Sequence, residues 1–446
     1  MTDTAQLPLV LESAPATVRP SVWVSVRAGL ARLAVALLRT LVAFGRYVLT
    51  VWAAFRCGLR WRTFCGNTGL AKQRQTVHGD DFTSYLSTKT FAVPRLRRVR
   101  IGQHGWTMRV QLRPGQDLAD YTAAAAPLRH LARAQSVRPR ELWDRPGFVE
   151  LAILRRDPLR GVLERPRQLE CGVIVAGTTE TGEPFVVDFN QEPHWLVSGA
   201  TDSGKSSLIA TCLAALAPTR DVLISWDLKF GIEGEAFRRR FTDVATTGPE
   251  VQAWCGRLLA LAGERAELFK TLRVANVREA EQLRGVALRR IYVWCDEVAE
   301  LATARNGEVK PEELLSDVLR VVQLCRAMGI HVVIAGQRFG SDLGKLVTAV
   351  RAQLGGRICL RVNDEETAKM VLAGLDPNVH TRAMGLPHKG MAIVKRRAEW
   401  EYARATYQSS AERYAIGDRH AGNRITWDDL LTEDRAIAAA ATTHGY

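Results

Sequence analysis

Eight consecutive residues have the types and spacing of a loop that binds phosphate groups. Residues 199–206 read Gly-Ala-Thr-Asp-Ser-Gly-Lys-Ser, which fits the pattern GxxxxGK[ST]. Glycines at these positions allow backbone N–H groups to turn towards phosphate oxygens, and the N-terminus of a following helix favours negative charge. We expect Lys205 to contact the β- and γ-phosphates of a nucleoside triphosphate and the Ser206 hydroxyl to coordinate Mg²⁺.

The residues on either side have the context that this loop needs. The apolar run 195–198 predicts a buried strand, and residues 207–213 predict a helix. The predicted nucleotide-binding residues are those of the loop and the start of the helix: Gly199, Ala200, Thr201, Asp202, Ser203, Gly204, Lys205, Ser206 and Ser207.

A second candidate lies downstream, where residues 291–297 read Ile-Tyr-Val-Trp-Cys-Asp-Glu. An apolar strand followed by two carboxylates suits hydrolysis, with Asp296 holding the hydration shell of Mg²⁺ and Glu297 polarising the attacking water. Taken alone, such a pair is also typical of a solvated strand end. After a phosphate-binding loop it favours hydrolysis of ATP over binding alone, with Lys205 and Glu297 as catalytic residues.

Composition sets broad limits on the elements that position these residues. The 446 residues give room for two or three domains, and 47% hydrophobic with 24% charged residues suits a globular protein. The net charge of +14 is compatible with a polyanionic partner. The eight cysteines include no CxxC pair, which favours reduced structural thiols over zinc ligands or disulfides.

The N-terminal part predicts an amphipathic or membrane helix. Residues 1–27 read as a polar tail, and 28–64 as a basic, membrane-associated helix. Arg32, Arg39 and Arg46 recur every seven residues, so they share one helical face and interrupt the run of about 20 apolar residues that a conventional span needs. The pattern favours an amphipathic helix at a membrane surface. Packing of the same helix on the protein itself or on neighbouring subunits is the alternative.

The rest of the chain predicts two folded parts. Residues 65–172 mix strand-like and helical stretches, and we expect a small α+β domain. Strands and helices alternate over 173–398, which predicts an α/β domain with a parallel sheet, and the weakly patterned residues 399–446 are expected to form a C-terminal tail.

Several motifs resemble the motor domain of FtsK/SpoIIIE-type DNA translocases. They are Trp226-Asp227-Leu228-Lys229, the pair Asp296-Glu297, and above all Arg326-Ala327-Met328-Gly329-Ile330-His331 followed by Ala335-Gly336-Gln337-Arg338. The size and the short basic N-terminal segment look most like plasmid transfer proteins of actinomycetes. Asp202 stands where the family usually has Gly, and Phe339 where it has Pro. An acid beside a triphosphate is unfavourable unless it points outward.

The resemblance implies a RecA-like motor that uses ATP and Mg²⁺ to move double-stranded DNA in conjugative plasmid transfer. It also implies a homo-oligomeric ring, a hexamer, at the cytoplasmic face of the cell membrane, attached peripherally or by a single pass, with transfer-accessory proteins as further partners. Gln337 would sense the γ-phosphate, and an arginine from a neighbouring subunit would complete each site. Arg326, Arg357 and Arg361 are the candidates for that arginine.

Three alternatives remain open at this point. One is a translocase for chromosome segregation or division with the same motor. Another is a related ATPase that moves proteins in secretion or couples to a single strand bound by a relaxase. The last is a membrane scaffold without catalysis.

Overall fold

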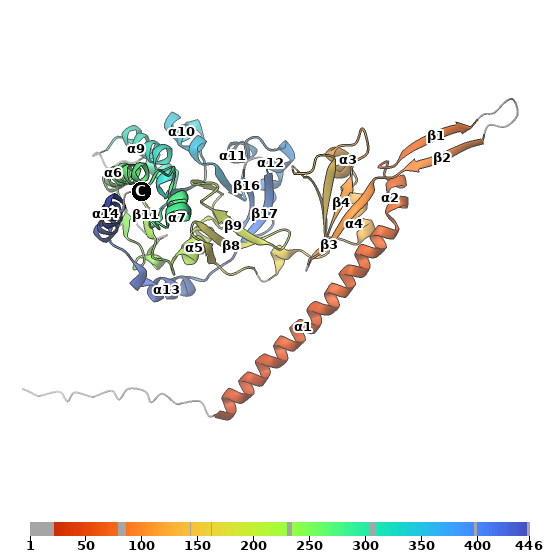
Figure 1. Cartoon of the computed structure of the whole chain (residues 1–446), viewed down its shortest axis with the longest axis horizontal. Coiled ribbons are helices and arrows are strands. Elements are labelled where there is room, and N and C mark those ends of the chain that lie inside the picture. The colour runs from red at the N-terminus through yellow and green to blue at the C-terminus, as the bar shows by residue number, and fades with distance from the viewer. Residues whose placement is uncertain are drawn as a thin grey trace, which may run out of the picture. The chain divides into compact units, whose positions relative to one another are not determined.

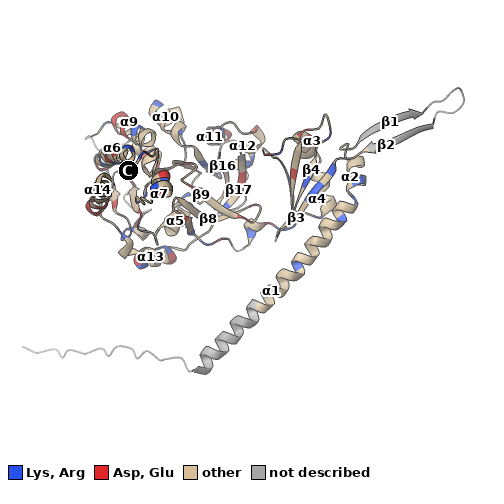
Figure 2. Cartoon of the chain, in the orientation of Figure 1, with Lys and Arg blue, Asp and Glu red and all other residues tan. Residues whose placement is uncertain are grey.

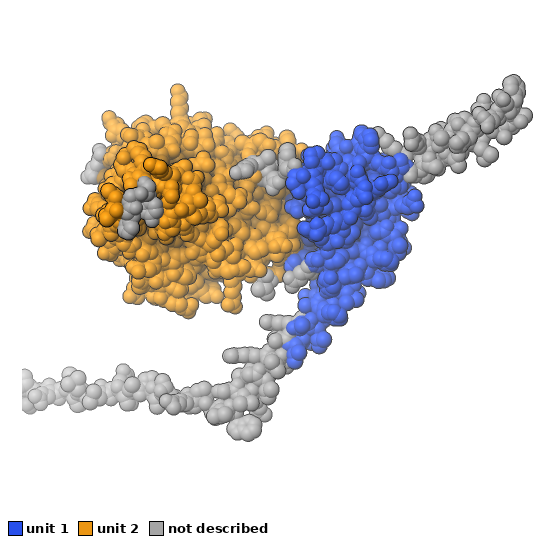
Figure 3. Space-filling view, in the orientation of Figure 1, with its two compact units in different colours: residues 1–156 blue, residues 157–446 orange. Residues whose placement is uncertain are grey.

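The computed structural model describes residues 22–78, 86–102, 104–142, 144–161, 163–229, 234–303, 309–396 and 399–443 (Figure 1). The chain divides into two compact units, residues 1–156 and 157–446, which Figure 3 shows in different colours. Each unit has its own hydrophobic core and is described by itself.

The first unit contains a four-stranded antiparallel sheet with helices packed on it. Its elements are α1 (Val22–Leu59), α2 (Trp61–Asn67), β1 (Lys72–His78), β2 (Leu86–Ala92), β3 (Arg95–Ile101), β4 (Gly105–Gln111), α3 (Leu118–Ala123), α4 (Ala125–Ala132), β5 (Ser136–Glu141) and β6 (Phe148–Leu154). The sheet order is β3-β4-β6-β5, while β1 and β2 pair with each other in a separate hairpin. Trp106, Met108 and Val110 alternate along β4 and are buried, as expected for a sheet with one covered face. An α+β domain was predicted here.

The C-terminal end of helix α1 packs on the core of the first unit, whereas the described residues before it are exposed. Ala54 and Cys57 are buried in the core of the unit, and Trp61 of α2 continues that face by donating its indole N–H to the Pro94 carbonyl at 2.8 Å. Residues 40–49 are exposed. The helix begins at Val22 rather than near residue 28, so the predicted start was wrong. Side chains of residues 22–36 and of Arg39 lie outside the described part, so the predicted arginine face is described only at Arg46.

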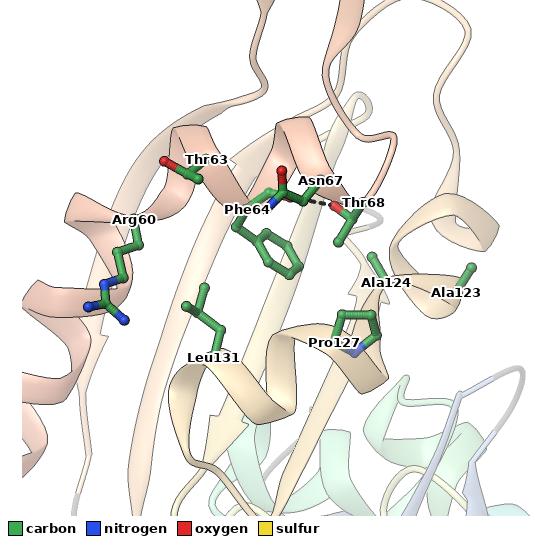
Figure 4. A pocket seen from close by; sticks show the side chains of 9 residues that line it. All are labelled: Arg60, Thr63, Phe64, Asn67, Thr68, Ala123, Ala124, Pro127 and Leu131. Carbon is green, nitrogen blue, oxygen red and sulfur yellow. Dashed lines mark hydrogen bonds between the residues drawn. The ribbon is translucent and has the colours of Figure 1, made fainter.

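A groove of about 660 Å³ lies between α2 and the α3–α4 pair (Figure 4). Phe64, Pro127 and Leu131 supply apolar lining, and Arg60 lies at one side. The groove therefore combines an apolar lining with a cation next to the end of α1.

The second unit contains, within the described residues, an 11-stranded mixed sheet in the order β12-β11-β13-β14-β10-β15-β16-β17-β8-β7, with β9 paired to β8. The strands are β7 (Arg167–Glu170), β8 (Val173–Thr179), β9 (Pro184–Asp188), β10 (Trp195–Ser198), β11 (Val222–Trp226), β12 (Asp243–Ala245), β13 (Ile291–Cys295), β14 (Ile330–Gly336), β15 (Gly356–Leu360), β16 (Met391–Arg396) and β17 (Glu399–Ala405). The six strands β12-β11-β13-β14-β10-β15 pair in parallel, and the other strands pair antiparallel.

Helices cover both faces of this sheet. They are α5 (Lys205–Leu216), α6 (Gly248–Leu272), α7 (Val277–Arg284), α8 (Val298–Ala302), α9 (Pro311–Leu324), α10 (Lys345–Gln353), α11 (Glu365–Val371), α12 (Pro377–Met384), α13 (Ser410–Arg419) and α14 (Trp427–Thr443). Trp195 and Val197 pack in the core that contains α5, whereas Leu196 between them packs in the core that contains α6 and α9. Burial on both faces explains why these strands read as continuous apolar runs.

Two predicted boundaries were wrong. The small domain was expected to end at residue 172, but β7 pairs with β8 and so belongs to the larger sheet. The expected C-terminal tail, 399–446, is part of the second unit, because β17 pairs with β16 and with β8. Helix α14 is fixed by an ion pair between Asp434 and Arg265 of α6, 2.7 Å apart and buried.

Candidate nucleotide-binding site

The predicted site residues follow neighbouring strands at one edge of the parallel sheet. Strand β14 lies between β10 and β13, so the loop after β10, the carboxylates after β13 and Gln337 after β14 meet at the carboxyl edge. Ser198 is aligned with Gly336, so the strand before the phosphate loop and the strand before Gln337 are neighbours. Ligands of open α/β sheets bind at this edge.

Two glycines of the phosphate loop are required by close packing. Gly204 has φ +103°, and a Cβ there would lie 2.5 Å from the Gly390 nitrogen. A Cβ at Gly199 would lie 2.4 Å from the Ser203 Oγ. Helix α5 begins at Lys205 directly after Gly204, so its N-terminal N–H groups lie where the motif places phosphate oxygens.

Glu297 is the centre of the charged cluster at this edge. Its Oε2 lies 2.9 Å from Lys205 Nζ and 3.3 Å from Lys229 Nζ, and its Oε1 accepts the Gln337 backbone N–H at 3.2 Å. Burial acts to raise the pKa of Glu297, but Lys205 and then Lys229 outweigh it, so this pKa is lowered. Glu297 is therefore an ionised carboxylate that contacts two lysines, one of which belongs to the phosphate loop.

Lys229 ends one of the motifs that resemble the motor family, and its contact with Glu297 was not predicted. Strands β11 and β13 are adjacent, with Trp226 aligned to Cys295, so the residues after both strands converge. Burial lowers the pKa of Lys229, but Glu297 outweighs it and the pKa is raised. Asp227 is buried and accepts the N–H groups of Lys229 and Gly234 at 3.1 and 3.4 Å, which holds the turn that carries Lys229.

The candidate Mg²⁺ ligands are both oxygen donors at this edge. Ser206 is partly exposed in the first turn of α5, and Asp296 is partly exposed at the end of β13. A hydroxyl and a carboxylate are the hard ligands that Mg²⁺ prefers, so the donor set fits this ion.

The two departures from the family pattern have structural explanations. Asp202 has φ +64°, a conformation that favours Gly, and its side chain is exposed and paired with Lys389. The acid therefore points outward. Phe339 is buried in the core beside Gly336, where its ring supports the turn that carries Gln337.

The three candidate arginines occupy different places. Arg357 donates to the Met370 and Val371 carbonyls at 3.0 and 3.2 Å and is half-buried. Arg361 is exposed after β15, and its carbonyl accepts the N–H of Ala200 in the phosphate loop. Arg326 is exposed in the turn before β14, at the opposite edge of the sheet.

Comparisons with known proteins agree with this geometry. Residues 165–341 match the FtsK/SpoIIIE family, and residues 38–155 match the actinomycete conjugal transfer protein N-terminal domain. Transfer protein TraSA of Streptomyces ambofaciens is 35% identical over 350 residues, which cover 74% of this chain and 82% of that protein. DNA translocase FtsK of Halalkalibacterium halodurans is 27% identical over 234 residues, 48% of this chain and 29% of that protein.

A solved structure supports the fold. The monomer form of the pCW3 conjugation coupling protein TcpA with ATPγS has a TM-score of 0.53 at 21% identity, covering 74% of this chain and 93% of that chain. The chain belongs to the FtsK/SpoIIIE family and carries the N-terminal domain of actinomycete conjugal transfer proteins. It is an ATPase with the fold of P-loop motor domains, as the sequence predicted.

Proposed function

We propose that the chain is an ATP-driven translocase of double-stranded DNA in conjugative plasmid transfer. The observation that carries this proposal is the Lys205–Glu297 pair beside the phosphate loop, in a chain that covers most of transfer protein TraSA. Similarity to DNA translocases extends the proposal from hydrolysis to movement of DNA.

The residues divide the chemistry as follows. Lys205 exchanges Glu297 for phosphate oxygens when ATP enters the loop, and Glu297 then accepts a proton from the attacking water. Ser206 and Asp296 would hold Mg²⁺, which would supply neutralisation of the charge on the phosphates. Gln337 senses the γ-phosphate through its side-chain amide, and its backbone N–H, which donates to the catalytic Glu297 at 3.2 Å, holds the residue beside the site. Gln337→Ala is expected to bind ATP normally and to move DNA poorly.

A ring of subunits, six in the family, would place each site at a subunit interface. A residue acting on a neighbour's nucleotide must lie away from its own phosphate loop and be exposed. Arg326 meets both conditions, whereas Arg357 is bonded to backbone carbonyls and Arg361 adjoins its own loop. We therefore assign Arg326 the role of stabilising charge in the neighbouring site.

The DNA substrate is tested by the rate of ATP hydrolysis. The net charge of +14 suits contacts with backbone phosphates, which are independent of sequence and weaken with salt. We expect stimulation by duplexes, increasing with duplex length, and little by single strands. Equal stimulation by single strands would favour a coupling protein for a relaxase-bound strand, and none by either nucleic acid would favour a protein-secretion motor. A translocase for chromosome segregation would give the same ATPase result. The two functions are separated by measuring transfer of a plasmid that lacks the gene, because only a transfer protein is needed for it.

Helix α1 is proposed to bind the cytoplasmic membrane surface. Leu41, Phe44, Trp52 and Phe55 are among its exposed apolar side chains, and Figure 2 shows that its described part carries few charges, all basic. Within the described residues, no helix is long and apolar enough to span a bilayer. Apolar side chains with arginines suit the interface of an anionic membrane.

Vesicle flotation tests this membrane claim. The full chain is expected to float with anionic vesicles, and a variant with Leu41→Ser, Phe44→Ser and Phe55→Ser is expected to stay behind with unchanged ATPase activity. If the variant floats equally well, α1 is instead a contact for accessory transfer proteins or for other subunits.

A further inference from the structure

The phosphate loop carries a negative charge whose neutralisation involves a distant part of the chain. Asp202 replaces the small uncharged residue usual in such loops, and its carboxylate repels a triphosphate through the intervening solvent. The Asp202 Oδ1 contacts Lys389 Nζ, and the two side chains are 64% and 68% exposed. Since both charges are accessible, salt and nucleotide can compete with their contact.

The backbone holds Lys389 beside the loop. The Gly390 N–H donates to the Ser203 carbonyl at 2.9 Å, and a Cβ at Gly204 would lie 2.5 Å from the Gly390 nitrogen. The Arg404 Nε donates to the Lys389 carbonyl at 3.3 Å. The turn before β16 is thus fixed against the phosphate loop, so Lys389 is near the site whatever the conformation of its long side chain.

We propose that Lys389 is a positioning residue of the ATP site that compensates the charge of Asp202 and thereby sets the affinity for the triphosphate. The inference rests on the proposed ATP-binding role of this loop. The cation offsets the acid, so a loop that would otherwise repel ATP keeps its affinity. The Asp202–Lys389 pair controls the net charge next to the phosphates and leaves the fold of the loop unchanged.

The proposal predicts changes of opposite sign at the two positions. Lys389→Ala leaves Asp202 uncompensated and is expected to weaken ATP binding about two- to fivefold at low salt, the range for exposed charge pairs. Asp202→Asn leaves Lys389 uncompensated and is expected to tighten binding by a similar factor. Asn also tolerates φ near +64°, so the backbone is not strained by this change. The double variant is expected to return near the parent value.

The experiment is displacement of a fluorescent ATP analogue by ATP and by ADP, in the full chain without DNA, at two salt concentrations. ATP carries more charge than ADP, so the changes should be larger for ATP and should shrink at high salt. Lys389→Arg is expected to bind like the parent. Lys270→Ala is the matched control, because Lys270 is equally exposed and pairs with Glu267 at 2.6 Å on α6.

The outcomes separate this inference from the proposed function. A parent chain that binds neither nucleotide contradicts both. A parent that binds ATP overturns the inference alone if Asp202→Asn weakens binding, if Lys389→Ala matches Lys270→Ala, or if the changes are equal for ATP and ADP.

Discussion

Two buried ion pairs lie at opposite edges of the sheet in the second unit. Lys205 and Glu297 are 2.9 Å apart at the carboxyl edge, with side chains 11% and 4% exposed. Arg265 and Asp434 are 2.7 Å apart and 1% and 6% exposed, beside the residues that precede β13 and β14. By distance and burial the two pairs are alike.

Their other partners differ. Arg265 also donates to the Met328 and Arg289 carbonyls at 2.6 and 3.0 Å, so backbone groups fix it in place. Lys205 instead meets a carboxylate that it shares with Lys229, next to a loop built for phosphates. Burial of charge therefore does not distinguish the proposed catalytic pair from a structural one. What distinguishes the two pairs is the partner of the cation, because a phosphate group can take the place of Glu297 beside Lys205.

The largest expected effect of breaking either pair is on catalysis. Glu297→Gln removes the proposed proton acceptor and is expected to slow ATP hydrolysis about 100-fold or more. ATP binding should persist, because Lys205 and the loop remain. Phosphate release and nucleotide binding measured on one preparation check this, and hydrolysis at the parent rate would show that Glu297 is not the base.

The structural pair should respond in stability instead. Asp434→Ala leaves the Arg265 guanidinium buried without its counter-charge and is expected to cost about 3–5 kcal/mol of unfolding free energy. Urea denaturation measures the change. Asp418→Ala is the matched control, since Asp418 pairs with Arg239 at 3.0 Å on the surface, where about 1 kcal/mol or less is expected. Equal losses in the two variants would contradict the distinction.

A smaller effect is expected in the pH dependence of stability. The lowered pKa of Glu297 means that this group stabilises the fold above its ordinary pKa of about 4.3, and that the contribution is lost as pH falls through the lower folded-state pKa. Lys205→Met removes the main charge that offsets the effect of burial on the pKa of Glu297, so this pKa should rise. The difference in unfolding free energy between parent and variant should therefore be larger at pH 7 than at pH 3.5. A difference independent of pH would show that the lysine does not act through this carboxylate.

Each part of the candidate site could be predicted from the sequence because it depends on a local pattern. The phosphate loop, the strand ending at Glu297 and the strand ending at Gln337 are each contained in a few consecutive residues. The missed contacts join distant segments: Asp202 and Lys389 are 187 residues apart, and Arg265 and Asp434 are 169 apart. Nothing local marks these partners. The pairing of β17 with β8, which lie far apart in the chain, made β17 part of the second unit for the same reason.

Displacement of a third strand from a duplex tests whether this ATPase moves along DNA. A fluorescent third strand is bound at increasing distances from the duplex end, and its release is followed after ATP is added. We predict release that needs hydrolysable ATP, with a delay that grows in proportion to distance, and no release by Glu297→Gln. A chain that hydrolyses ATP in the presence of the duplex but leaves the third strand bound at every distance would contradict the account.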